Sequence, residues 1–271
     1  MSVWIPCSTA ANNTFESSGA TIENADSLEK IVHGLEIKFY RLIQDEKPKR
    51  LLVPALYAAE DYDSKQPVIV MEDYQNCFSV DLKLFFIAEQ IAHLQIFSIR
   101  NKRWITVVQK NERDWLNHMK RTIPSLTRSI SQKLMENMPG KLSCLKIFLE
   151  NTIDKDPDWM GTIVDQYFNG EKPFVMIHGD MWSGQILWRD ENTMAGIVDW
   201  QGAHRGSPDE VKHISPLCCI PCIFGVAFIP KSDIVKRNEK PDNERINTFV
   251  NRCEAFVEDV IELCGWQMKH E

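Results

Sequence analysis

Apolar and polar residues first form a clear periodic pattern over residues 28–43, where apolar side chains recur every three or four positions. This spacing predicts an amphipathic helix, because it brings the apolar side chains to one face. The 27 residues before it are small and polar, so they predict a loop. Residues 51–63 are typical of a short strand and turn. Residues 67–74 predict a buried strand, since Val68 to Met71 are all apolar.

Helix is expected to predominate from residue 81 onward. Residues 82–99 are apolar nearly all round, which is typical of a helix buried among others. Residues 111–166 keep helical periodicity but contain Pro124, Pro139 and Pro157, so they predict several separate helices. Residues 241–266 predict a closing helix with one apolar face.

A β-rich region at residues 174–208 interrupts these helices. Short apolar runs within residues 174–180, 185–188 and 196–200 alternate with turn-forming residues and predict a strand–turn–strand structure. The complete pattern predicts an α+β fold. Its first part, up to about residue 76, mixes helix and strand, and the remainder is mostly helical with an embedded hairpin.

The longest uncharged stretch is residues 214–230, which contain Pro216, Pro221 and Gly225. Its length is at the lower limit for crossing a bilayer, and the prolines and glycine would break an isolated helix. No matched flanking charges or aromatic belt accompany it, so we expect a kinked core segment and no membrane insertion.

The same stretch carries a C-C-x-x-C cluster, formed by Cys218, Cys219 and Cys222. A structural zinc site needs a second pair of ligands at a suitable spacing, and neither His204 nor His213 provides one. Small hydrophobic cysteines within an apolar segment are therefore the preferred interpretation.

Composition and charge exclude several classes of function. The chain of 271 residues has a formal net charge of −7 and contains no basic block, so nucleic acid is not an expected partner. Its eight cysteines are irregularly spaced, and the N-terminus lacks the pattern of a secretory signal. We therefore expect reduced thiols and a cytoplasmic protein.

Candidate chemistry concentrates in the β-rich region. Asp180 follows one apolar run, Gln185 begins the next, and Asp199 ends the third. A hairpin would bring the three to one end. Phosphoryl transfer uses such a set, since one carboxylate orients and deprotonates a hydroxyl while an amide and a second carboxylate hold Mg²⁺. Taken singly, each residue is also explained as a turn former or strand end.

Two other classes of function remain open from the residues alone. A metal-dependent hydrolase would use histidines and carboxylates of this region, although no H-E-x-x-H or H-x-H spacing occurs. Its candidate ligands are His178, Asp180, Asp199, His204 and His213. The second alternative is a non-catalytic binding or scaffold protein.

Residues 178–188 (HGDMWSGQILW) and 197–208 (IVDWQGAHRGSP) resemble the catalytic and metal-binding loops of the choline-kinase-like (CHK) kinase group. This group includes ecdysteroid-kinase-like and nematode kinase-like families, relatives of the aminoglycoside phosphotransferases. The resemblance implies a protein-kinase-like two-lobed fold, with a partial N-lobe at residues 1–76 and a helical C-lobe at residues 77–271. It also implies ATP and Mg²⁺ as cofactors and a small-molecule alcohol as substrate, for example a choline-, aminoglycoside- or steroid-like alcohol.

The resemblance also assigns roles. In the catalytic loop, Asp180 would be the catalytic base and His178 a second catalytic residue, and Gln185 and Asp199 would be magnesium ligands. Residues 67–75 (PVIVMEDYQ) are similar to the strand and hinge between the lobes, so the nucleotide would meet Glu72, Asp73 and Tyr74. Residues 33–43 (HGLEIKFYRLI) resemble the regulatory helix, whose glutamate is Glu36 here.

The chain departs from the family pattern at the nucleotide site. Residues 2–9 (SVWIPCST) resemble the strand that carries a lysine, but Trp4 stands at the lysine position, and no lysine or arginine precedes Lys30. Gly19 cannot by itself build a phosphate loop. Gln185 replaces the usual asparagine. We therefore expect a weak or inactive phosphotransferase, either a truncated form of a working kinase or a degenerate pseudokinase.

Overall fold

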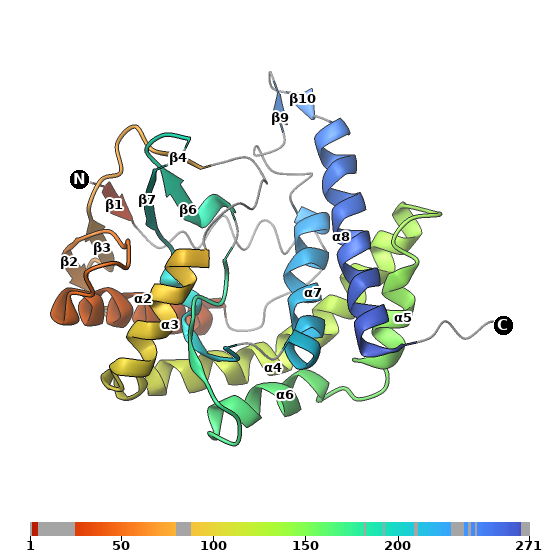
Figure 1. The fold of residues 1–271 in the computed structure, drawn as a ribbon, viewed down its shortest axis with the longest axis horizontal. Coiled ribbons are helices and arrows are strands. Elements are labelled where there is room, and N and C mark those ends of the chain that lie inside the picture. The colour runs from red at the N-terminus through yellow and green to blue at the C-terminus, as the bar shows by residue number, and fades with distance from the viewer. Residues whose placement is uncertain are drawn as a thin grey trace. The chain divides into compact units, whose positions relative to one another are not determined.

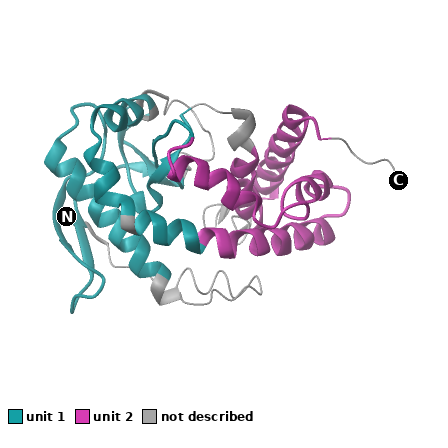
Figure 2. Ribbon diagram, turned by 90° about the horizontal axis from the view of Figure 1, so that it is seen from below, with its two compact units in different colours: residues 1–13, 22–118, 172–208 teal, residues 14–21, 119–171, 209–271 magenta. Residues whose placement is uncertain are grey.

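The computed structural model is an α+β structure, mostly helical with small antiparallel sheets. It describes residues 2–4, 25–79, 88–181, 183–191, 193–208, 211–228, 236–237, 240–241 and 243–266. The chain forms two compact units (Figure 2). The first comprises residues 1–13, 22–118 and 172–208, and the second comprises residues 14–21, 119–171 and 209–271. The predicted hairpin thus belongs to the same unit as residues 25–79, and a lobe boundary near residue 76 stays a prediction.

The first unit begins with a helix and a three-stranded antiparallel sheet. Helix α2 (Ala25–Glu46) coincides with the first predicted amphipathic helix. The sheet has the order β1 (Ser2–Trp4), β3 (Val68–Met71) and β2 (Leu56–Glu60), so β3 is its central strand. In this sheet Trp4 pairs with Ile69. The two strands predicted from residues 51–74 are therefore confirmed as a hairpin.

The β-rich region forms two further antiparallel sheets of the first unit. Strands β6 (Ile186–Trp188) and β7 (Met194–Ile197) form the predicted hairpin, and β4 (Phe78–Ser79) pairs with β6. Strand β5 (Val175–Ile177) does not join them. It pairs with β8 (His204–Gly206), a strand that the sequence pattern did not indicate. Two short 3₁₀ helices, η1 (Ser183–Gln185) and η2 (Trp200–Gly202), lie beside these strands in the chain.

One hydrophobic core joins the helices and strands of the first unit. The apolar face of α2 contributes the fully buried Leu35 and Phe39, and the β-rich region contributes Ile197 and Trp200. The rings of Phe39 and Trp200 stack with centroids 3.9 Å apart and an interplanar angle of 10°. Other members of the core are Ile37, Tyr40, Leu42, Leu51, Leu56, Ile69, Leu94, Trp104, Val108, Met176 and Ala203.

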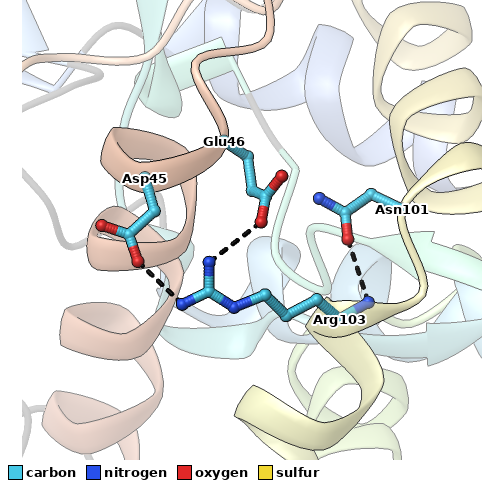
Figure 3. Close-up of polar contacts among 4 residues, drawn as sticks. All are labelled: Asp45, Glu46, Asn101 and Arg103. Atoms are coloured by element: carbon cyan, nitrogen blue, oxygen red, sulfur yellow. Dashed lines mark hydrogen bonds and ion pairs between the residues drawn. The ribbon is translucent and has the colours of Figure 1, made fainter.

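Two more helices complete the first unit. These are α3 (Ala88–Arg100) and the first part of α4 (Arg103–Asn137). Arg103 at the start of α4 donates to carboxylates of Asp45 and Glu46 at 2.9 and 3.0 Å, and its backbone N–H donates to Asn101 at 2.9 Å (Figure 3). This contact fastens the start of α4 to the end of α2. Because the groups are exposed to solvent, the ion pairs contribute little to stability by themselves.

The second unit is a set of helices. It contains the rest of α4, α5 (Cys144–Asn151), α6 (Trp159–Phe168), α7 (Val211–Phe228) and α8 (Asn243–Cys264). Two antiparallel strands of two residues each, β9 (Lys236–Arg237) and β10 (Lys240–Pro241), precede α8. Helix α8 packs against α7 and α5 (Figure 1). The closing helix predicted from residues 241–266 is confirmed.

One prediction about helix boundaries needs correction, because Pro124 does not separate two helices but lies inside α4. Most of the predicted core segment at residues 214–230 lies in the single helix α7, which contains both Pro216 and Pro221. Burial of the surrounding apolar residues compensates the hydrogen bonds that these prolines remove. No helix within the described residues is long and apolar enough to span a membrane. The start of the helix predicted at residue 81 lies outside the described residues.

The stacked ring pair of the first unit predicts a large effect of Phe39→Ala. Removing a fully buried phenyl ring leaves a cavity against Trp200, so the free energy of unfolding should fall by about 3–5 kcal/mol. Urea unfolding monitored by circular dichroism measures this loss. Tyr57→Ala is the control, because Tyr57 is 61% exposed and its loss should change stability by less than about 0.5 kcal/mol. Equal effects of the two substitutions would contradict the packing of this core.

Candidate functional site

Asp180 lies in the loop that follows β5. The preceding Gly179 has a φ of +86°, a left-handed conformation that favours glycine. A Cβ atom at Gly179 would overlap the backbone carbonyl of Gly202, so the loop after β5 passes directly against η2. Asp180 itself is exposed. The close passage of two backbones therefore presents its carboxylate at the surface of the unit.

The side chains of Gln185 and Asp199 are in contact, as expected from the predicted hairpin. The backbone N–H of Val198 donates to the carbonyl of Gln185 at 3.0 Å, which places the end of η1 beside the end of β7. The side-chain amide of Gln185 donates to a carboxylate oxygen of Asp199. It also hydrogen-bonds Asp180, whose pKa is raised by desolvation of the carboxyl group, and this contact partly opposes that rise. One amide thus lies between the two carboxylates.

His178 connects the loops that carry these carboxylates. Its Nε2 donates to the carbonyl of Val198 at 2.9 Å, and its Nδ1 accepts the backbone N–H of Asp180 at 3.3 Å. This pairing requires a neutral ring with its proton on Nε2. Burial lowers the pKa of His178 to about 4, so the ring stays neutral at neutral pH. Both nitrogens of His178 are therefore engaged with the backbone.

The electrostatic environment of the site is acidic. Burial, followed by the nearby charge of Asp180, raises the pKa of Asp199 to about 6. Asp199 also adopts a left-handed backbone conformation, with φ +66° and ψ +56°, which is uncommon for a residue with a side chain. Such conformations persist only where the surroundings hold them in place, and here Trp200 is buried in the core directly after Asp199.

Glu36 of α2 reaches the same loop. It is only 2% exposed, and burial together with the charge of Asp199 raises its pKa to about 8, although Tyr40 and the backbone of Trp200 partly oppose this. Within the described residues, one of its carboxyl oxygens has no hydrogen-bond partner, and none of the ion pairs includes Glu36. The charge that acts on the carboxyl group of Glu36 is therefore that of Asp199, another acidic residue.

The residues expected to contact a nucleotide lie directly after β3. The backbone N–H of Glu72 already donates to the carbonyl of Ala55 at 2.8 Å, and the carbonyl of Tyr74 accepts the N–H of Cys77 at 2.9 Å. The hydroxyl end of Tyr74 lies over Gly196 of β7, where a Cβ atom would overlap it. These contacts attach the segment to β2 and β7. Whether Glu72, Asp73 and Tyr74 bind a nucleotide stays a prediction.

Sequence reasoning missed the residues that anchor β8. Glu112 of α4 is fully buried, accepts the backbone N–H of Arg205 at 2.7 Å and forms an ion pair with its guanidinium at 3.2 Å. His204 lies against Trp115 of α4, with ring centroids 4.6 Å apart, and donates to the carbonyl of Gly202 at 2.6 Å. Burial lowers the pKa of His204 to about 4. A charged residue inside a helix pattern carries no local signal of such a partner, which lies 93 residues away.

Asp180, Gln185 and Asp199 supply oxygen donors, which suit Mg²⁺. In the part of the chain that the structure describes, no group of three or more histidine, cysteine or acidic residues is arranged to hold a metal ion. Two carboxylates and an amide fit a cation that also keeps oxygen ligands from phosphate and water. To bind it, Gln185 would have to turn its amide oxygen toward the cation.

Comparison with protein-family models gives a match over residues 7–220 to the family DUF1679, described as "Uncharacterized oxidoreductase dhs-27". The match covers well over half of the 271 residues. The chain belongs to the DUF1679 family. DUF1679 is a nematode-type family. No curated protein and no solved structure matches the chain.

Gly179→Ala should lower the free energy of unfolding of this DUF1679 chain by more than the strain of a left-handed alanine alone. Gly140 has nearly the same φ, +84°, but a Cβ atom there meets nothing within 4 Å. Gly140→Ala is thus the matched control and should cost about 1 kcal/mol. Gly179→Ala should cost at least about twice that, since the clash with Gly202 adds to the strain. Chemical denaturation measures both, and equal costs would contradict the close passage.

The raised pKa of Glu36 predicts that this DUF1679 chain loses stability as pH rises. In the folded state Glu36 keeps its proton up to about pH 8, whereas unfolding returns its pKa to about 4.5. The resulting stabilisation is complete below pH 4.5 and is lost as pH rises toward 8. The free energy of unfolding should therefore fall by up to about 1.4 kcal/mol per pH unit.

The free energy of unfolding is to be measured between pH 6.5 and pH 8. Below pH 6.5 the lowered pKa values of His178 and His204 act in the opposite direction, because these rings take up protons more readily when unfolded. Glu36→Gln should flatten the decline, and Glu136→Gln, at an exposed position of α4, should preserve it. An unchanged slope in Glu36→Gln would show that Glu36 is not the group responsible.

Proposed function

We propose that this chain is a phosphotransferase that transfers phosphate from a magnesium-bound nucleotide to the hydroxyl group of a small molecule. The observation that carries the proposal is the convergence of Asp180 and Asp199 on the amide of Gln185. Asp180 and Gln185 lie on the connection between β5 and β6, and Asp199 lies between β7 and η2. Their residue types match the needs of phosphoryl transfer, which depends on positioning and charge more than on covalent chemistry.

Asp180 would act on the acceptor. Its carboxylate is exposed and follows a loop whose backbone is held on one side by Gly202 and on the other by His178. A carboxylate in that position can accept a hydrogen bond from an alcohol and take its proton during transfer. His178 has no free ring nitrogen and would position this loop instead of moving a proton itself.

Asp199 and Gln185 would hold the cation, which supplies charge neutralisation for the phosphate groups. The raised pKa of Asp199 supports this role, since a second negative charge lies close by and only a cation or a proton relieves it. The side chain of Gln185 is already fixed between the two carboxylates. To hold a cation, Gln185 would turn its amide oxygen toward it, and contacts with the cation would replace the hydrogen bond between Gln185 and Asp199.

We further propose that transfer is slow. Glu36 has no cationic partner among the described residues, whereas kinases use a lysine there to hold nucleotide phosphates. Loss of one charge-assisted contact costs on the order of 1.5–3 kcal/mol, or roughly tenfold to more than a hundredfold in binding. A weak enzyme and a pseudokinase that binds its ligand without turnover are the two outcomes that this site permits.

The description of the DUF1679 family names an oxidoreductase. Dinucleotide-dependent oxidoreductases of the Rossmann type bind their cofactor on a parallel sheet with a G-x-G-x-x-G turn. This chain contains no such motif, and every strand pair in the described residues is antiparallel. For the site formed by this chain, phosphoryl transfer is therefore better supported than dinucleotide-dependent oxidation.

The proposal is tested by titrating the full chain with ATP in the presence and absence of Mg²⁺, using calorimetry. We expect Mg²⁺-dependent binding that Asp199→Asn weakens at least tenfold, because the variant loses a charged ligand. Asp180→Asn should bind nucleotide but lose transfer to choline, ethanolamine, an aminoglycoside or a steroid alcohol. The transfer assay uses ATP labelled in its terminal phosphate.

Glu191→Gln is the matched control, because it removes one negative charge from an exposed position in the same hairpin. It should leave nucleotide binding unchanged. Binding of a reduced nicotinamide dinucleotide with no binding of ATP would overturn the proposal. Turnover at ordinary kinase rates would contradict the part of the proposal that predicts slow transfer.

A further inference from the structure

The cysteines of this chain are concentrated in its second unit. Of the seven described cysteines, none of which is in a disulfide, only Cys77 belongs to the first unit. The other six lie on three helices of the second unit, namely Cys144 on α5, Cys218, Cys219 and Cys222 on α7, and Cys253 and Cys264 on α8. The site proposed above uses none of them.

Helices α7 and α8 lie side by side and form the most extensive helix contact of the second unit (Figure 1). At this contact the thiols of Cys222 and Cys253 hydrogen-bond each other. Cys253 is only 4% exposed, whereas Cys222 is half-buried and so keeps access to solvent. A thiol on one helix therefore touches a thiol on its neighbour, and one of the two can be reached from outside.

The surroundings also make the two thiols chemically different. The hydrogen bond from Cys253 lowers the pKa of Cys222, while the same bond and burial raise the pKa of Cys253. Burial raises the pKa of Cys218 and Cys219 on the same helix, and raises that of Cys144 to about 12. Because the thiolate is the nucleophile, Cys222 should be the most reactive of the three cysteines of α7, although Cys218 is more exposed.

We propose that Cys222 and Cys253 are a redox-reactive thiol pair, which a peroxide oxidises to a disulfide that joins α7 to α8. An accessible thiol in contact with a buried partner on an adjacent helix is the arrangement of an attacking and a resolving cysteine. The oxidant is a small hydroperoxide, which needs no binding pocket to reach a half-buried sulfur.

The reaction takes two steps. The thiolate of Cys222 attacks one oxygen of hydrogen peroxide, the O–O bond breaks, and hydroxide leaves and takes up a proton as water, so that Cys222 becomes a sulfenic acid. The sulfur of Cys253 then attacks the sulfenic sulfur. Its proton and the departing hydroxide form a second water molecule, and the S–S bond closes. The two thiols together give two electrons to the peroxide.

The test treats the purified full chain with one equivalent of hydrogen peroxide, unfolds it, and alkylates the remaining thiols for mass spectrometry. The wild-type chain should lose two of its eight alkylatable thiols. Reduction with dithiothreitol should restore them, and peptide mapping should link residue 222 to residue 253. A linked pair that does not contain both residues would overturn the proposal, as would an unreacted chain.

The variants separate the roles of the two thiols. Cys222→Ser should abolish the linked pair, and Cys253→Ser should leave a sulfenic acid at Cys222 that dimedone traps. Cys218→Ser and Cys264→Ser are the matched controls, one on each helix, and should still lose two thiols. Since a polar group replaces a buried sulfur in Cys253→Ser, Cys253→Ala provides a second variant, and circular dichroism verifies that each is folded. Loss of two thiols in Cys222→Ser would refute the assignment.

Discussion

The ring of His178 holds the candidate site together, because it hydrogen-bonds the carbonyl of Val198 with one nitrogen and the N–H of Asp180 with the other. These contacts join the loop after β5 to the end of β7, and the bond between Val198 and Gln185 extends the connection to η1. The arrangement needs a neutral imidazole, since a protonated ring could not accept from Asp180. Burial supplies that condition by keeping the pKa of His178 near 4. The connection between β5 and β6 and the segment after β7 thereby present their side chains to one place.

The same burial that positions these side chains leaves acidic groups without a compensating cation among the described residues. Asp180, Asp199 and Glu36 all have a raised pKa, and the charges of Asp180 and Asp199 raise the pKa of their neighbours. Buried carboxyl groups without a cation are costly, so a protein that keeps them trades stability for a site. A magnesium-bound nucleotide would relieve this charge, which is the physical argument for the proposed phosphoryl transfer.

Helix α2 determines the conformation of the loop that carries Asp199. Phe39 and Tyr40 follow Glu36 by three and four positions, so the three side chains lie on the same face of the helix. Phe39 stacks on Trp200, while Glu36 and Tyr40 lie next to Asp199. The left-handed backbone of Asp199 is strained by itself, and the buried Trp200 beside it provides the packing that maintains the strain. In the second unit, helix packing has a different result, since it brings cysteine thiols of α7 and α8 into contact.

The sequence by itself determined α2, the strands β2 and β3, the β6–β7 hairpin, the closing helix and the meeting of Gln185 with Asp199. Each depends on local periodicity, or on a turn between neighbouring strands, which residues close in sequence specify. Only the tertiary structure decided that β5 pairs with β8, that Glu112 is buried against Arg205, and that α4 and α7 continue through their prolines. These features depend on partners distant in the chain. Strand β8 has only three residues, His204, Arg205 and Gly206, with no apolar alternation, so its burial and its partner follow from packing and leave no local pattern to read.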